Sequence, residues 1–190
     1  MSDKLASHWN TNGVANEYLS KFWVLFLMPL ISFGLFLLFV VIPRVDPLNN
    51  IKNFTGYYWS LVVSILIYML YGELLIIVWN LGFTFNMFQA LLPAIGILYF
   101  LIGVVMRKVK RNWFIGIRTP WTLSSDIVWD KTHKLGSKIF IISGVVGILG
   151  FFFENYFALL LLLVPIMVGT IFLVVYSYFE YKKINNKTND

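Results

Sequence analysis

The sequence predicts an all-α polytopic membrane protein with about five transmembrane helices and a cytoplasmic amphipathic helix. Of its 190 residues, 59% are hydrophobic and only 13% are charged, and the mean hydropathy is +0.77. A soluble domain of this length needs a larger polar share to cover its surface. Long stretches carry no charge at all, which indicates that lipid is the main solvent of this chain.

Five apolar runs predict membrane spans, because a helix needs about 20 apolar residues to cross a bilayer. The runs are Phe22–Ile42, Tyr57–Trp79, Phe83–Met106, Ile139–Phe153 and Tyr156–Tyr178. The fourth run is short, so we expect its helix to begin earlier, near Leu135. Its closeness to the fifth run predicts an antiparallel helical hairpin. Small residues recur from Ser143 to Gly150, which favours close helix packing over a ligand role.

Lysine and arginine are distributed unevenly between these runs. Two precede the first run, two follow it, eight follow the third, three follow the fifth, and none follows the second or fourth. Cytoplasmic segments of membrane proteins are enriched in both residues. The count predicts a multi-pass protein of the cell membrane with its N-terminus outside and its C-terminus cytoplasmic, since this orientation places 13 basic residues inside and 2 outside.

We therefore expect one membrane domain, 1–190, divided by the spans. Its parts are an extracellular N-terminal segment (1–21), three spans (22–106), a cytoplasmic motif loop (107–138), a helical hairpin (139–178) and a cytoplasmic tail (179–190). The first part is polar and lacks the apolar core of a signal peptide.

Composition and motifs disfavour several classes of function. The chain has no cysteine, which excludes thiolate metal sites and cysteine nucleophiles. Its net charge of +6 lies in short segments between spans, so we expect no direct binding of nucleic acid. Neither H-E-x-x-H, G-x-S-x-G nor a phosphate loop is present, and the two histidines are predicted on opposite membrane faces. We expect no enzymatic activity, no metal and no cofactor.

The motif loop carries the densest pattern of polar and aromatic residues. A basic cluster after Met106 suits a helix C-terminus and anionic headgroups, so membrane lipid is an expected partner. Gly116 and the pair Thr119-Pro120 predict a turn that presents Arg118 and Trp121. For Arg118, a headgroup anchor and a specific functional contact remain equally open.

A helix is predicted to begin at Leu123-Ser124-Ser125-Asp126, with a serine cap and an acid in its first turn. The four-residue spacing of Trp129 and His133 places both on one side of this helix. An interfacial amphipathic helix that leads into the fourth span fits the pattern.

Glu73 is the only acidic residue well inside a predicted span. Ionisable groups at such positions are costly and often functional. One interpretation is a small proton- or ligand-linked transporter, which would need to form a homo-oligomer because five spans without an internal repeat offer no symmetric pathway. The other is an interhelical hydrogen bond of a protonated or solvated Glu73, with Asn86 and Gln89 as candidate partners.

The motif loop also resembles the signature of the SdpI family. The residues that carry this resemblance are Asn112-W-F-I-Gly116-I-Arg118-Thr119-Pro120-Trp121-Thr122-L-S, Trp129, Thr132-His133 and Leu135-Gly136. The N-terminal part is similar to a module often fused to that family. Its matching residues are His8-Trp9-Asn10, Gly13, Pro29 and the later string Pro43-Arg44-Val45-Asp46-Pro47.

The resemblance implies a membrane immunity protein that protects a bacterium from a secreted, membrane-active peptide toxin. In the best-known case the toxin-bound protein also holds a transcriptional repressor at the membrane, so the implied partners are a toxin and a cytoplasmic repressor. Relatives of this layout usually carry a further span ahead of the histidine, which this sequence lacks. The implied functional residues are Asn112, Gly116, Arg118, Thr119, Pro120, Trp121 and His133 in the motif loop, and His8, Asn10 and Gly13 outside. The alternative is that the motif only shapes the loop and docks it on the bilayer.

Overall fold

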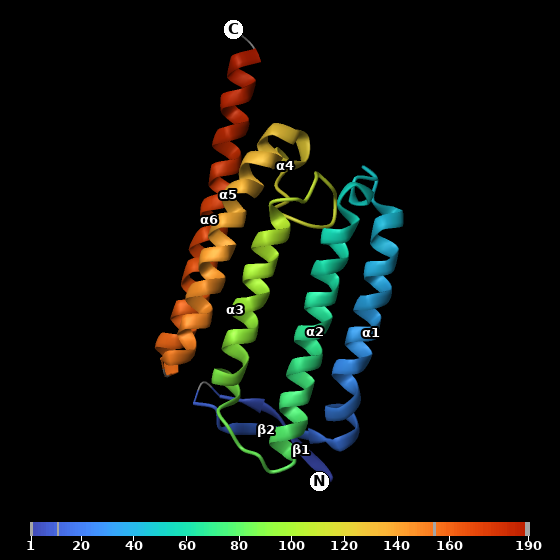
Figure 1. Ribbon diagram of the computed structural model, residues 1–190, viewed down its shortest axis with the longest axis vertical. Helices are drawn as coiled ribbons and strands as arrows, with labels where there is room; N and C mark the ends of the chain where they lie inside the picture. Colours follow the sequence, from blue (N-terminus) through green and yellow to red (C-terminus); the bar gives the residue numbers. More distant parts are fainter. Residues whose placement is uncertain (1, 11, 154, 189–190) are drawn as a thin grey trace.

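The computed structural model describes residues 2–10, 12–153 and 155–188, and 76% of the chain is helical. Five helices are long and apolar enough to cross a membrane, which confirms the predicted fold class. In chain order these are α1 (Lys21–Val45), α2 (Thr55–Asn80), α3 (Met87–Met106), α5 (Asp126–Leu149) and α6 (Asn155–Thr188). The helices lie side by side along the long axis of the molecule (Figure 1).

The shorter elements gather at the two ends of this bundle. Two strands, β1 (Lys4–Trp9) and β2 (Ala15–Ser20), form an antiparallel hairpin across one end, next to the α2–α3 connection. The opposite end holds the α1–α2 connection with its 3₁₀ turn Ile51–Phe54, the irregular connection 107–119, and the short helix α4 (Pro120–Ser124). The C-terminal part of α6 extends beyond this second end (Figure 1).

The predicted amphipathic helix and fourth span form one continuous helix, α5. Asp126 begins this helix, and the Ser125 side chain accepts the Val128 N–H as its cap. The expectation of an earlier start and of a serine cap is therefore confirmed. A short 3₁₀ turn, Gly150–Phe152, ends the segment before α6 returns antiparallel to it.

Glycines bring α3 and α5 into backbone contact. A Cβ atom added to Gly96 would lie 2.8 Å from the Gly144 carbonyl oxygen, and one added to Gly144 would lie 2.6 Å from the Gly96 oxygen. About two helical turns further along α3, a Cβ on Gly103 would meet the Ser137 oxygen at 2.8 Å. The small residues of the fourth span therefore serve close helix packing, as predicted.

The boundary between α2 and α3 is packed less closely. An apolar cavity of about 390 Å³ lies between these helices, with Ser64 and Tyr71 on one wall and Pro93 and Leu101 on the other. The Tyr71 hydroxyl donates a hydrogen bond to the Ala90 carbonyl across the same boundary, at 3.0 Å. Helices α3, α5 and α6 thus form the tighter part of the bundle.

The hairpin is the element that sequence reasoning missed. Asn80 at the end of α2 acts as a third partner of the sheet, since its Oδ1 accepts the Ala6 N–H at 2.8 Å and its Nδ2 donates to the Ala6 oxygen at 3.0 Å. Trp9 adds an edge-to-face contact with Trp79, at 5.4 Å between ring centroids. An isolated two-stranded hairpin is marginally stable. This one is stabilised by contacts with residues some 70 positions away, which local sequence patterns do not reveal.

Candidate functional site

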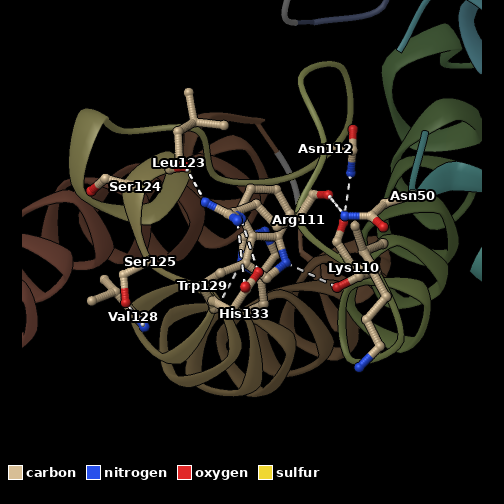
Figure 2. Close-up of polar contacts among 12 residues, drawn as sticks. Asn50, Lys110, Arg111, Asn112, Leu123, Ser124, Ser125, Val128, Trp129 and His133 are labelled. Carbon is tan, nitrogen blue, oxygen red and sulfur yellow. Dashed lines mark hydrogen bonds and ion pairs between the residues drawn. The ribbon is translucent and has the colours of Figure 1, made fainter. Parts of the chain in front are cut away.

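A single buried asparagine organises the 107–119 connection. The Asn112 Nδ2 donates to the carbonyls of Lys110 and Ile115, both at 2.9 Å, and its Oδ1 accepts the N–H groups of Phe114 (2.8 Å) and Ile115 (2.7 Å). The side chain is fully buried, and all of its hydrogen-bonding capacity is used within the loop. Asn112 therefore holds a compact turn closed without any regular secondary structure (Figure 2).

His133 fastens this turn to α5. Its Nε2 accepts the Ile117 N–H at 3.0 Å, while its Nδ1 lies 2.9 Å from the Trp129 carbonyl oxygen one helical turn earlier. Because Nε2 must accept and Nδ1 must donate, these partners fix a neutral imidazole with its proton on Nδ1. His133 is thus a positioning group of the loop, and its ring is buried.

Trp129 supports the histidine and holds the other end of the connection. Its ring stacks on His133 with 3.9 Å between centroids, and its Nε1 donates to the Val109 carbonyl at 3.0 Å. Val109 and Ile117, eight positions apart, are therefore hydrogen-bonded to side chains on the same face of α5. The predicted shared side of Trp129 and His133 is the side that receives the loop.

Gly116 permits the close approach between loop and helix. Its φ is +116°, which L side chains rarely adopt, and an added Cβ would lie 2.3 Å from the His133 Nε2. Both the backbone conformation and the space require glycine at this position.

Thr119, Pro120 and Trp121 begin α4 rather than a simple turn. Thr119 is the N-cap in a reciprocal capping box with Thr122, and Pro120 takes the first helical position, where its missing N–H costs nothing. The Thr119 hydroxyl also lies 3.1 Å from the Ser177 hydroxyl of α6. Trp121 packs edge-to-face on Tyr178 of α6, at 5.2 Å between centroids. These three predicted residues therefore join the motif to the last helix.

Arg118 is exposed, in contrast to the residues around it. Its guanidinium donates to the Trp113 carbonyl at 2.7 Å, and the Trp113 side chain is itself 49% exposed. Arg107, Lys108 and Lys110 are exposed on the same connection. The outer surface of the loop is therefore cationic and carries one free aromatic ring, a combination suited to anionic headgroups or to an acidic partner.

Two residues that were not among the candidates complete the site from the α1–α2 connection. Asp46 is buried, and its Oδ1 accepts the Trp113 N–H at 3.2 Å, while its Oδ2 accepts the Asn50 N–H at 3.1 Å. The Asn50 Nδ2 donates to the Arg111 carbonyl at 2.8 Å (Figure 2). The only sequence signal for this docking was the string around Asp46 that the family resemblance includes.

Arg111 closes the site on the side of α5. Its Nε lies 2.8 Å from the Asp126 Oδ1, and its Nη1 donates to the Leu123 carbonyl at 2.7 Å. Asp126, the acid predicted in the first turn of the helix, therefore pairs with Arg111 of the basic cluster that follows α3. Among the described residues there is no group of three or more His, Cys, Asp or Glu that could hold a metal ion.

The N-terminal candidates lie at the other end of the bundle. His8 pairs through Nδ1 with the Asn16 Oδ1 at 2.7 Å across the hairpin. The Asn10 Oδ1 accepts the Val14 N–H at 3.0 Å and so closes the turn between the strands. Gly13, with φ +74°, lies so close to the cap of α3 that a Cβ would meet the Asn86 side chain at 2.6 Å. These residues shape the hairpin and seat it on α3.

Glu73 lies apart from both clusters. Its side chain is only 5% exposed and faces the interior of the protein, and neither carboxyl oxygen has a hydrogen-bond partner among the described residues. The suggested hydrogen bonds to Asn86 and Gln89 are therefore wrong, since neither forms among the described residues. The Asn86 side chain instead caps α3 by accepting the Gln89 N–H at 3.1 Å.

The comparisons with known proteins agree with this organisation. Residues 108–177 match the SdpI/YfhL protein family, and residues 1–33 match a domain of unknown function, DUF1648. The chain is 27% identical to the Immunity protein SdpI of Bacillus subtilis (strain 168) over 187 residues, which are 97% of this chain and 87% of that relative. No solved structure is a significant match. The resemblance to the SdpI family that the motif predicts is therefore confirmed.

Replacing Gly116 with alanine tests the contact between loop and helix. We expect Gly116→Ala to lower the free energy of unfolding by about 1–3 kcal/mol from backbone strain alone, with a further cost from displacing His133. Thermal unfolding in detergent, followed by tryptophan fluorescence, measures the effect. Gly34→Ala is the matched control, since nothing lies within 4 Å of an added Cβ there. Equal melting temperatures for the two variants would contradict the proposed packing.

Proposed function

We propose that this chain is a membrane immunity protein that protects its cell from a secreted, membrane-active peptide toxin. The observation that carries the proposal is the similarity to the Bacillus subtilis Immunity protein SdpI across nearly the whole chain, which includes both the hairpin and the motif loop. The structure adds a physical rationale. The hairpin and the motif loop lie at opposite ends of the helical bundle (Figure 1), so in the proposed orientation one faces arriving molecules and the other faces the cytoplasm.

The proposed orientation places the hairpin outside and the motif loop in the cytoplasm. The α1–α2 connection, the motif loop and the C-terminal part of α6 share one end of the bundle (Figure 1). These segments carry nearly all of the basic residues, which are enriched on the cytoplasmic side. The chain then lies in the cell membrane with its N-terminus outside.

Single cysteines test this orientation, because the chain has no cysteine of its own. A membrane-impermeant maleimide should label Val14→Cys in intact cells and label Lys108→Cys only after permeabilisation, since the exposed side chains of Val14 and Lys108 lie at opposite ends. The reverse labelling pattern would overturn the orientation.

We also propose that the protein signals by binding a cytoplasmic repressor. The exposed cationic face of the 107–119 connection, together with the exposed ring of Trp113, is the surface that such a repressor would bind. The connection contacts α5 through His133, α6 through Thr119, and the α1–α2 connection through Asp46. A shift of any of these elements would therefore change the shape of the cationic face that the repressor binds.

Survival of a toxin-sensitive bacterium that expresses the chain tests immunity. We expect protection by the wild type and reduced protection by Arg118→Ala, because the Arg118 guanidinium holds the Trp113 carbonyl and shapes the exposed surface. Lys108→Ala is the control, as it removes an exposed cation of the same loop. The two variants are compared at equal membrane abundance. Absence of wild-type protection against every membrane-active peptide tried would reject the function itself.

Proton- or ligand-linked transport is a second candidate, favoured by the buried carboxyl of Glu73, which has no hydrogen-bond partner in the described part of the chain. It predicts that the wild type dissipates a pH gradient across proteoliposomes and that Glu73→Gln, which keeps the shape without the charge, abolishes this flux. Glu17→Gln on the exposed strand β2 is the control. A wild type that leaves the gradient unchanged would remove this candidate.

A further inference from the structure

The two edges of the N-terminal hairpin differ in whether their backbone groups are paired. The outer edge of β1 is covered, because both the N–H and the carbonyl of Ala6 are bonded to the Asn80 carboxamide. Ala6 is fully buried there. The Asn80 side chain thus takes the place of a neighbouring strand.

The outer edge of β2 is unpaired. Ala6 lies opposite Tyr18 in the antiparallel register. In such a ladder, opposite residues either bond to each other or both turn their backbone groups outward. Since Ala6 turns outward to Asn80, Tyr18 turns to the far edge of β2. Outside the β1–β2 ladder, no backbone hydrogen bond to the N–H or carbonyl of Tyr18 is found within the described ranges.

Around Tyr18, this free edge has little of the usual protection against strand pairing. Natural edge strands are blunted by proline, lysine, bulges or a covering segment. Strand β2 contains neither proline nor lysine, and the register shifts of the hairpin fall between Ala6 and Trp9 of β1, on the turn side of the Ala6–Tyr18 pair. Its residues are mostly exposed, with Tyr18 at 54%, and the neighbouring Val14 and Leu19 are apolar and exposed as well. Such an edge is a template for a further strand.

A groove accompanies the strand. It has a volume of about 390 Å³ and lies between Val14, Ala15 and Tyr18 of the hairpin and Thr84, Phe85 and Asn86 of the α2–α3 connection. Such a volume is within the range of ligand sites, about 300–1,000 Å³. Aromatic rings and amide groups line it together, so it offers contacts both to side chains and to the peptide backbone.

We propose that the free edge of β2 and this groove bind an extended peptide segment by strand addition. The main-chain groups of Tyr18 supply the pairing, and the groove receives side chains on one face of the added strand. That the natural peptide is a secreted toxin rests on the proposed function. The binding mode itself rests only on the hairpin geometry.

The test uses the full chain in nanodiscs and a fluorescent peptide of alternating threonine and valine, a strong strand former without a specific sequence. We expect saturable binding to the wild type, and about tenfold weaker binding to Tyr18→Pro, which lacks the N–H at the free edge. Tyr18→Phe keeps that N–H and should bind like the wild type. The same peptide N-methylated at every residue should not bind, which tests the pairing even if the proline variant disturbs the hairpin.

Several results would overturn the proposal. These are no binding to the wild type, equal binding to Tyr18→Pro, or equal binding of the N-methylated peptide. Disulfide-linked dimers of Val14→Cys without peptide binding would show instead that a second copy of the chain occupies the edge. Protection from toxin by wild type and Tyr18→Pro alike would leave the immunity function standing while the strand-addition site fails, so the two ideas are tested separately.

Discussion

The motif end of the molecule depends on one constraint, which is that irregular backbone beside a bilayer must have its polar groups satisfied. Unpaired N–H and carbonyl groups cost free energy, and the cost rises where water is scarce. The 107–119 connection meets this demand with hydrogen bonds from side chains. Asn112 forms hydrogen bonds with four backbone groups within the loop, and His133 of α5 accepts a fifth, the Ile117 N–H. The position of every exposed residue on this surface, including Arg118, follows from that internal network.

Sequence reasoning found the features that depend on local composition. Hydropathy placed all five membrane helices, because a span of apolar residues is recognisable wherever it lies. The Ser125 cap was also readable, since a cap needs only the residues that follow it. The motif identified Asn112, Gly116 and His133 as important, but their bonding partners were not predictable, because Ile117 and His133 meet only after the chain has folded.

Features formed by distant residues escaped prediction for the same reason. The hairpin depends on Asn80 and Asn86, neither of which marks a strand in the sequence. Asp46 docks the α1–α2 connection onto Trp113, yet nothing in the spacing of these residues indicates that they meet. The partners suggested for Glu73 were chosen by depth in the membrane. Depth does not determine which face of α3 a side chain occupies, and Asn86 is used as a cap instead.

The helices of the bundle do not all pack equally closely, and this difference affects which of them can move. Helices α3 and α5 touch backbone to backbone at Gly96 and Gly144, whereas a cavity of about 390 Å³ separates parts of α2 and α3. The α3–α5 contact is therefore the stiffer part of the bundle, and the α2–α3 boundary is the part that deforms more easily. Contacts at both ends of the bundle join elements across this boundary, the hairpin through Gly13 against Asn86 and the motif loop through Asp46. Tilting α1 and α2 together against the other helices would therefore strain the contacts at both ends of the bundle at once.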